Sequence, residues 1–222
     1  MITFDKLKIV TNIEDITNID TTVFVTQTKD GEILYHKYRQ ESPFCLLIQA
    51  DYNKQELVIE FTGKILKEDY PQLINRNNIV QCLEAINGMG ICRIDTEAIL
   101  AHGEVCKCDV TKDISSTQMQ EIIAQMKQSL TNYDKWSCAK YQGNGLVIYK
   151  TVKTDRYKKR LSIYDKHKEL TMACNREFLN TISNREELLA YFQDRIRFEL
   201  NIDTKAQIRL LLGVMDNRLH SV

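Results

Sequence analysis

Residues 195–202 alternate strictly between polar and apolar side chains, and this pattern constrains the fold more than any other stretch of the chain. Successive side chains of a β-strand point to opposite faces of a sheet. One face of this strand would carry Ile196, Phe198, Leu200 and Ile202, and the other would carry Arg197 and Glu199. A strand with one apolar and one polar face is typical of an antiparallel sheet that has its core on one side.

The first region of the chain, residues 1–70, is rich in β-prone runs. Residues 21–28 and 33–39 form a predicted hairpin, because Asp30-Gly31 between them favours the positive φ angles of a tight turn. Further strands are predicted over residues 2–11, 44–49 and 57–62. We expect this region to be a β-meander with a structural role.

Helices alternate with strands in the second region, residues 71–222. Strands are predicted over residues 90–95, 105–110, 135–141, 145–152 and 160–166. Helices are predicted to start at residue types that favour N-caps, namely Asn77, Ser115, Asp165, Asn184 and Thr204. Ser115 with Gln118 makes a predicted capping box. Together the two regions predict one compact α+β unit, in which helices cover one face of an antiparallel sheet and the other face is polar and catalytic.

Three predicted strands place reactive side chains on one polar face of the sheet. In residues 105–110, the apolar face would hold Cys106, Cys108 and Val110. The opposite face would gather Asp109, Tyr164, Arg197 and Glu199. Two carboxylates can hold Mg²⁺ or Mn²⁺, and a tyrosine beside a metal and an arginine can attack a phosphodiester. The alternative is a solvated face with ordinary ion pairs.

Residues 150–168 are strongly basic, although the whole chain balances 30 basic against 30 acidic residues. The basic residues are Lys150, Lys153, Arg156, Lys158, Lys159, Arg160, Lys166 and Lys168. Tyr149, Tyr157 and Tyr164 lie among them. Basic residues bind phosphates and aromatic rings stack on unpaired bases, so the stretch indicates a nucleic-acid partner. A charged hairpin edge that serves only solubility is the alternative.

Other classes of protein have little support in the sequence. The chain lacks a run of about 18 apolar residues and a signal-peptide pattern, so we expect a cytoplasmic protein without a membrane partner. Its seven scattered cysteines then read as reduced thiols. Cys106 and Cys108 have no second ligand pair at zinc spacing. No Gly-rich phosphate loop is present, so ATP is not expected.

Three short motifs carry a family resemblance. They are Lys107-Cys-Asp-Val-Thr111, Ser162-Ile-Tyr-Asp-Lys-His-Lys-Glu-Leu170 and Ile196-Arg-Phe-Glu-Leu200. In this order they resemble phage and plasmid replication proteins of the gene II/X type, which include the initiator of filamentous phages. The run at 57–66 and the predicted helix near 77–87 also look like that family, so the resemblance spans loosely from about residue 44 to 212. Initiators of staphylococcal rolling-circle plasmids are distantly similar.

The resemblance implies a rolling-circle replication initiator. Such a protein nicks one strand of an origin with a tyrosine, stays bound to the 5′ phosphate, and later rejoins the strands. Its partners would be origin DNA, single-stranded or as a hairpin at the nick site, and a host helicase and polymerase. A homodimer on DNA is also compatible with the family.

The motifs assign roles to particular residues. Tyr164 would be the nucleophile and Lys166 a phosphate contact. Asp109 and Glu199 would hold Mg²⁺ or Mn²⁺, and Glu169 would be a third ligand or a structural residue. Arg197 would pair with a carboxylate or contact the scissile phosphate. The basic residues at 150, 153, 156, 158, 159, 160 and 168 would bind DNA.

The sequence departs from the resemblance in ways that leave alternatives open. Many such initiators use a His-hydrophobic-His metal pair, whereas all four histidines here are isolated. Asp95 follows Arg93-Ile94, and this triplet matches the first acidic motif of the family, so Asp95 is the alternative to Asp109. Tyr149 and Tyr157 are rival nucleophiles. A non-catalytic origin- or operator-binding protein and a mobilisation relaxase are the alternative functions, and the chain could be the N-terminal part of something longer.

Overall fold

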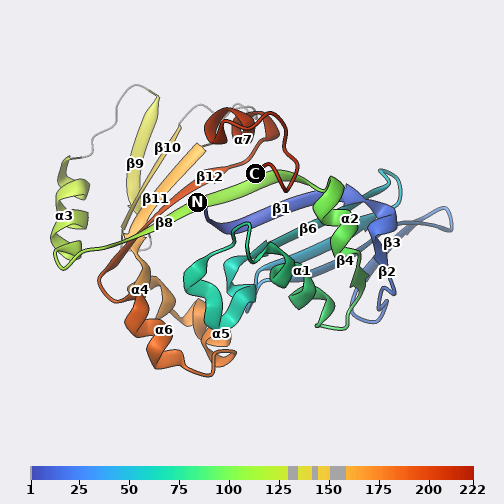
Figure 1. Cartoon of the computed structure of the whole chain (residues 1–222), viewed down its shortest axis with the longest axis horizontal. Helices are drawn as coiled ribbons and strands as arrows, with labels where there is room; N and C mark the ends of the chain where they lie inside the picture. The colour runs from blue at the N-terminus through green and yellow to red at the C-terminus, as the bar shows by residue number, and fades with distance from the viewer. Residues whose placement is uncertain (1, 130–134, 142–144, 151–158) are drawn as a thin grey trace.

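A ten-stranded antiparallel sheet forms the centre of the computed structural model, which describes residues 2–129, 135–141, 145–150 and 159–222 (Figure 1). Its strands are β1 (Phe4–Asn12), β3 (Val25–Lys29), β4 (Glu32–Gln40), β5 (Leu46–Asp51), β6 (Glu56–Thr62), β8 (Glu104–Ser115), β9 (Trp136–Tyr141), β10 (Gly145–Lys150), β11 (Lys159–Asp165) and β12 (Arg195–Ile202). Their spatial order is β3-β4-β5-β6-β1-β8-β12-β11-β10-β9. Two short strands, β2 (Ile16–Thr17) and β7 (Arg93–Ile94), pair separately. The predicted α+β class with an antiparallel sheet is confirmed.

The α-helices are α1 (Ile79–Asn87), α2 (Thr96–His102), α3 (Met119–Ser129), α4 (Lys166–Leu170), α5 (Arg176–Asn180), α6 (Arg185–Phe192) and α7 (Lys205–Leu212). The 3₁₀ helices are η1 (Ile13–Asp15), η2 (Gly63–Gln72) and η3 (Ala173–Asn175). Asp165 and Thr204 are confirmed as caps, since each side chain accepts a backbone N–H of its helix. Among the described residues, no helix is long and apolar enough to cross a membrane.

Two predicted helix starts are displaced by one residue. Helix α1 follows Asn78 rather than Asn77. Strand β8 continues through Ser115, so the hydroxyl that accepts the Gln118 N–H, at 3.2 Å, belongs to Ser116. Both differences arise because runs of cap-type residues offer neighbouring positions of similar propensity.

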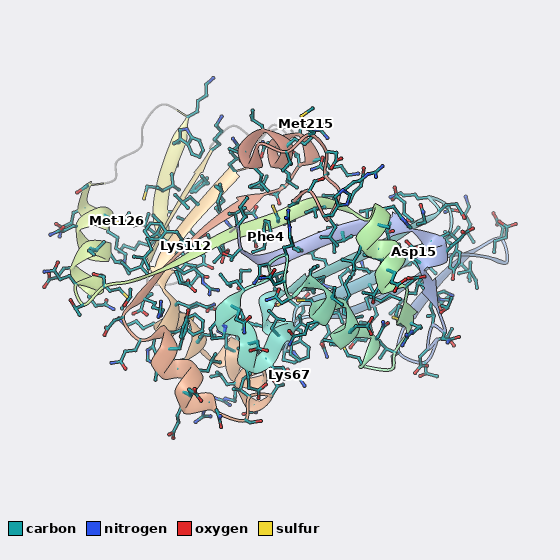
Figure 2. The ribbon with its side chains drawn as sticks, viewed as in Figure 1. Phe4, Asp15, Lys67, Lys112, Met126 and Met215 are labelled. Atoms are coloured by element: carbon teal, nitrogen blue, oxygen red, sulfur yellow. The ribbon has the colours of Figure 1, made fainter. Side chains whose placement is uncertain are left out.

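Helices α1, α2, α3 and α7 cover the apolar face of the sheet (Figure 1). Helices α1, α2 and α7 share a large core with residues such as Ile9 and Ile59, which are fully buried. Helix α3 places Met119 and Ile123 against Ile163. Its Met126 and the core residue Phe4 are labelled in Figure 2. Each such side chain contributes about 1.5–3 kcal/mol by leaving water.

A second, smaller core lies at one end of the polar face. It is built by η2, α4, α5 and α6 and contains Tyr70, Phe178 and Phe192. The Tyr70 and Phe192 rings lie 5.3 and 5.5 Å from the guanidinium carbon of Arg197 on β12. Arg197 is therefore 0% exposed, and this end of the face is not the solvated surface that the alternative interpretation expected.

The ten strands fall into two halves with the same topology. In the first half, β1 lies beside β6, and β6, β5, β4 and β3 follow outward as a meander. In the second half, β8 lies beside β12, and β12, β11, β10 and β9 follow outward in the same way. Strands β1 and β8 pair antiparallel at the centre, so a pseudo-twofold axis normal to the sheet relates the halves. The two sequence regions, 1–70 and 71–222, therefore join in a single sheet.

The pairing of β1 with β8 contains two irregularities that set side-chain direction. Ile9 pairs with Val105 and Lys8 with Lys107, so Cys106 is an extra residue in β8. Such a bulge changes the alternation of side chains. Val105 and Cys108 consequently share the core, and the predicted placement of Cys106 beside Cys108 on the apolar face is wrong. Asp109 keeps its predicted position on the opposite face, as its pairing with Lys6 shows.

Local turn chemistry explains the first hairpin. Asp30 and Gly31 join β3 to β4 with φ angles of 53° and 85°, as the predicted tight turn requires. Thr21 and Phe24 precede the strand instead of belonging to it, because β3 begins at Val25. None of the seven cysteines, all of which lie in the described residues, forms a disulfide bond.

Candidate active site

Adjacent strands bring the predicted reactive residues onto one face of the sheet. Strand β12 lies between β8 and β11. In the register of these strands, Asp109 is opposite Asn201, and Tyr164 is opposite Arg197. Glu199 lies between these pairs and shares their face, since side chains two apart in a strand point the same way. The expected gathering of Asp109, Tyr164, Arg197 and Glu199 on the polar face thus agrees with the register.

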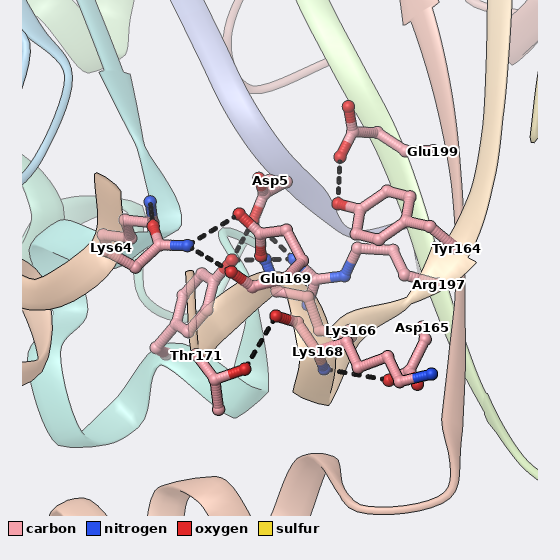
Figure 3. A network of polar contacts seen from close by, with 12 residues as sticks. Asp5, Lys64, Tyr164, Asp165, Lys166, Lys168, Glu169, Thr171, Arg197 and Glu199 are labelled. Carbon is pink, nitrogen blue, oxygen red and sulfur yellow. Dashed lines mark hydrogen bonds and ion pairs between the residues drawn. The ribbon is translucent and has the colours of Figure 1, made fainter. Parts of the chain in front are cut away.

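Tyr164 and Glu199 form the central contact of the site (Figure 3). The Tyr164 hydroxyl donates to Oε2 of Glu199 at 2.9 Å. Tyr164 is 3% exposed, and the ring of Tyr141 packs against it with 5.0 Å between centroids. Burial raises the pKa of Tyr164 well above its ordinary value, and the Glu199 carboxylate adds to the shift. The hydroxyl is therefore protonated at neutral pH and needs a base to act as a nucleophile.

Glu199 has the properties of such a base. The pKa of its carboxyl group is raised to about 7, mainly by burial. The negative charges of Asp5 and Asp109 also raise this pKa, while the positive charges of Arg197 and Lys166 lower it. A base whose pKa lies near the working pH combines the correct protonation state with a useful driving force for proton transfer. Its hydrogen bond with Tyr164 also places the carboxylate close enough to the hydroxyl to take the proton. Glu199 can therefore receive the proton of the tyrosine hydroxyl.

Asp109 is a second buried carboxyl group whose ionisation is disfavoured. Burial raises its pKa to about 6, although a hydrogen bond from Asn201 opposes the shift. The Asn201 side-chain amide donates to Oδ1 of Asp109 from the facing strand. The negative charge of Asp5 also raises the pKa values of Asp109 and Glu199, and that of Asp109 raises the pKa of Glu199, because these groups are poorly solvated.

Arg197 is held entirely by protein groups. Its Nε and Nη2 donate to the two carboxylate oxygens of Asp113, each at 2.8 Å. Its Nη1 donates to Asp5 at 2.8 Å and to the Tyr70 hydroxyl at 2.7 Å. A guanidinium group has five N–H donors, and these contacts use most of them. Of the two predicted roles, the structure therefore shows the pairing with a carboxylate, and it involves residues that the sequence did not indicate.

The position of Asp5 depends on the other irregularity in β1. Phe4 pairs with Val110 and Lys6 with Asp109, so Asp5 is an extra residue between two regular pairs. Its carboxylate accepts from Tyr70 at 2.8 Å and from Arg197. Burial alone would raise the pKa of Asp5, but the charges of Arg197 and Lys166 outweigh it and hold the pKa below its ordinary value.

Lys166 and Glu169 form a buried ion pair beside Tyr164. The Lys166 ammonium donates to Oε2 of Glu169 at 2.5 Å, and the Asn175 amide donates to Oε1 at 3.0 Å. Lys166 is 1% exposed, and its ammonium lies 5.7 Å from the centroid of the Tyr164 ring. Desolvation lowers the pKa of Lys166, while the charge of Glu169 opposes that shift. This geometry supports a positioning role for Lys166 rather than the predicted contact with a phosphate.

Lys64 is a better placed cation for an incoming phosphate. It is the second residue of η2, is only partly buried, and donates to the Asn175 side chain at 2.6 Å. Its charge lowers the pKa values of both Asp5 and Glu169, so it lies within electrostatic reach of the site. The sequence reasoning missed Lys64, because nothing in a lone lysine after a strand signals which distant residues it will meet.

A divalent cation fits one pair of carboxylates better than the predicted three. Asp109 and Glu199 are buried, interact, and have raised pKa values, so a nearby cation would stabilise their ionised forms. The buried Ser162 hydroxyl faces the same side opposite Glu199 and has no hydrogen-bond partner among the described residues. In contrast, Glu169 is neutralised by Lys166. Within the described part of the chain, no three His, Cys, Asp or Glu side chains form a group that could hold a metal ion.

The described basic residues of 150–168 do not form one patch. Arg160 is exposed on the polar face, opposite Asn201. Lys159 pairs with Ile202, and Lys150 lies over the Trp136 ring at 5.4 Å, so both project from the opposite face. Lys168 is exposed at the other end of β11. The predicted DNA contacts Lys153, Arg156 and Lys158 lie outside the described residues, as does the rival nucleophile Tyr157.

The remaining alternatives can be placed. Asp95 caps α2 by accepting the Ala98 N–H at 3.0 Å, so it belongs to the helical layer on the apolar side and not to the polar face. Tyr149 lies on the polar face opposite Arg160 and is 38% exposed. That position lies four residue steps along β11 from Tyr164, which corresponds to about 13 Å.

Three residues of the buried network carry no signal that sequence reasoning could have used. Asp5 depends on a bulge, Tyr70 on the path of η2, and Asp113 on the register of β8 with β12. No protein-family model matches the chain, and no curated protein sequence is significantly similar to it. The function must therefore be inferred from the site itself.

Proposed function

We propose that the chain is a rolling-circle DNA replication initiator that nicks one strand of an origin through Tyr164. The observation that carries this proposal is the 2.9 Å hydrogen bond from the Tyr164 hydroxyl to Glu199, a carboxylate with a pKa of about 7. A nucleophile joined to a base of matched pKa is a recurrent arrangement for covalent catalysis. The three motifs that resemble gene II/X-type replication proteins support the choice of DNA as substrate.

In the proposed reaction, Glu199 accepts the hydroxyl proton while the Tyr164 oxygen attacks phosphorus. The bond between phosphorus and the 3′ oxygen breaks, and the leaving 3′ oxygen takes a proton from water, which gives a 3′ hydroxyl that a polymerase can extend. The enzyme retains a 5′-phosphotyrosine ester. In the reverse step a 3′ hydroxyl attacks this ester, and Tyr164 recovers its proton. One phosphodiester is exchanged for another, so no ATP is consumed.

The surrounding residues would prepare this chemistry. Asp109 would hold Mg²⁺ or Mn²⁺, which when bound would polarise the phosphoryl oxygen, while Glu199 would keep its hydrogen bond to Tyr164 as the base. The Ser162 hydroxyl has hydrogen-bonding capacity left for a phosphate oxygen or a water. Lys64 would contribute positive charge, while Arg197 would fix Asp5 and Asp113, and Lys166 would fix Glu169 beside the tyrosine.

The test uses fluorescent single-stranded oligonucleotides that tile the DNA carrying the gene, incubated with the protein and Mn²⁺. We expect a protein–DNA adduct that survives denaturing electrophoresis. Tyr164→Phe should abolish the adduct, whereas Tyr149→Phe, a matched change on the same sheet face, should retain it. Loss of the adduct in Tyr149→Phe alone would show that the assignment of Tyr164 is wrong.

A second candidate function is favoured by the burial of Tyr164. At 3% exposure, its hydroxyl reaches a phosphate only if the Tyr141 side of the site opens. A non-catalytic origin- or operator-binding protein would need no such opening. It would bind the same oligonucleotides and form no adduct with any tiled sequence. A mobilisation relaxase would share the adduct chemistry and differ only in its DNA context.

A further inference from the structure

The side chains that enclose Tyr164 differ in how firmly they are held. Its hydroxyl donates to Glu199, and Arg197 lies opposite Tyr164 in the next strand (Figure 3). The Lys166 ammonium, at the start of α4, lies 5.7 Å from the centroid of the Tyr164 ring. On the side of β10 the neighbour is the ring of Tyr141, with 5.0 Å between the two ring centroids. With these four neighbours in place, Tyr164 is 3% exposed.

Three of the four neighbours are fixed by buried charges or by the sheet. The Arg197 guanidinium donates to both oxygens of Asp113, and the Lys166 ammonium donates to Glu169. Breaking a buried ion pair leaves a charge without its partner and is strongly unfavourable. Glu199 belongs to β12, which is paired on both sides with β8 and β11. These neighbours therefore cannot move aside without large losses elsewhere.

Tyr141 is held much more weakly than the other three. It ends β9, the outermost of the described strands on this side of the sheet (Figure 1). It is partly exposed, and its hydroxyl forms no hydrogen bond with a described residue. Its contact with Tyr164 is an aromatic pair, which adds little to the burial of the two rings. Of the four neighbours, Tyr141 is therefore the one whose displacement uncovers the Tyr164 hydroxyl at the lowest cost.

Gly145 provides the space that the Tyr141 ring fills. Tyr141, Gly145 and Tyr164 occupy one row across β9, β10 and β11, so the two tyrosines point to the same face. A Cβ added at Gly145 would lie 2.6 Å from the Cβ of Tyr164, closer than such atoms approach. Because the middle strand has no side chain in this row, the Tyr141 ring reaches across it. We call the space above Gly145 the glycine notch.

We propose that Tyr141 is a gating residue, whose ring must leave the glycine notch before a phosphate can reach Tyr164. This inference rests on the proposed nicking function and deepens it, because it names the side from which the DNA strand approaches. The strand would enter over β9 and β10, and its phosphate would take the space that the ring vacates. While the ring is in the notch, the Tyr164 hydroxyl and Glu199 remain shielded from solvent.

The first test measures the shielding itself and needs no DNA. N-acetylimidazole acetylates accessible tyrosines through the phenolate, and peptide mass spectrometry gives the rate at Tyr164. We expect slow acetylation in the wild type and in Tyr141→Phe, which keeps the ring. In Tyr141→Ala the rate should rise at least about tenfold, since each pKa unit lost on exposure raises the phenolate fraction tenfold. Tyr149→Ala removes another tyrosine from the same face and should leave Tyr164 slow. Tyr70, which is 0% exposed, should stay unmodified throughout and reports on folding.

The second test uses the adduct assay over a range of oligonucleotide concentrations. An aromatic pair of ordinary strength would keep the site closed about 2–12 times as often as open. Because only the open form binds, Tyr141→Ala should lower the half-saturating oligonucleotide concentration about 3–13-fold. The maximal rate should change much less, since the groups that act on phosphorus are the same. Tyr141→Phe and Tyr149→Ala should match the wild type in both quantities.

Two results would overturn the inference. Slow acetylation of Tyr164 in Tyr141→Ala would show that the ring does not close the site, whether or not the protein nicks DNA. A higher half-saturating concentration in Tyr141→Ala would mean that the ring binds the strand instead of excluding it. In contrast, faster acetylation without an adduct from any protein of the series would refute the proposed nicking function, and with it the role of the gate in nicking.

Discussion

Replacement of Glu199 by glutamine should remove the base and at the same time stabilise the fold at alkaline pH. The pKa of the folded carboxyl group is about 7, against an ordinary value of 4.5, so ionisation opposes folding. Each pKa unit corresponds to about 1.4 kcal/mol, which gives a cost of about 3 kcal/mol once the group is ionised. The sign follows from linkage, because the folded state binds more protons between these two pKa values. The contribution of Glu199 to stability is therefore fully present below its unfolded pKa and is lost as the pH rises through its folded pKa.

Urea unfolding between pH 5 and pH 8.5 measures this effect. The free energy of unfolding of the wild type should fall across this range, whereas Glu199→Gln should lose about 2–3 kcal/mol less. Adduct formation should fall by about 10²–10⁴-fold in the variant, which is the usual contribution of a general base. Glu186→Gln, an exposed residue of α6, is the matched control and should follow the wild type.

Parallel pH curves for the wild type and Glu199→Gln would refute the reasoning. They would mean that the carboxyl group titrates in the folded protein as it does in the unfolded chain. The hydrogen bond to Tyr164 would then be an ordinary structural contact. If the difference in unfolding free energy between the two proteins did not change with pH but the variant formed no adduct, Glu199 would be needed for catalysis without having a raised pKa.

The remaining predictions concern how the site is held. Arg197→Met should destabilise the fold by about 3–5 kcal/mol in urea unfolding, because it leaves the Asp113 carboxylate buried without its cation, and addition of Asp113→Asn should recover part of that loss. Gly145→Ala should destabilise by about 1–3 kcal/mol, because the added Cβ would lie 2.1 Å from the Ile163 carbonyl oxygen, whereas Gly88→Ala, with no neighbour closer than 3.5 Å, should be tolerated. The first account would be contradicted if the losses of stability from Arg197→Met and Asp113→Asn simply added. The second would be contradicted if Gly145→Ala and Gly88→Ala lowered the thermal unfolding temperature equally.

Much of the fold could be predicted because local patterns determined it. The alternation in 195–202, the Asp30-Gly31 turn and the caps at Asp165 and Thr204 each depend on neighbouring residues only. The gathering of the reactive residues on one face also followed from the period of two in a strand. The error at Cys106 had a different origin, since a bulge arises from pairing with another strand and leaves no signature in its own sequence.

The environment of the site was much less accessible to sequence reasoning. The interpretation of Lys166 as a phosphate contact assumed a solvated side chain, whereas η2 and α4 bury it against Glu169. Arg197 was expected near the reactive carboxylates, yet its partners come from β1, η2 and β8. Which charges are buried together depends on how distant segments pack, and the linear pattern does not contain that information.

The contact between Arg197 and Asp5 has a consequence for biogenesis. These residues are separated by 192 positions, and β1 completes its place in the sheet only when β8 has been made. Contacts of such high sequence separation close large loops and form slowly. During synthesis, the first half of the sheet can assemble while Asp5 still lacks its cationic partner. A ribosome-bound chain that ends before β12 would therefore carry Tyr164 and Asp109 without Glu199 or Arg197, and the proposed proton acceptor would join the site only as the last strand inserts.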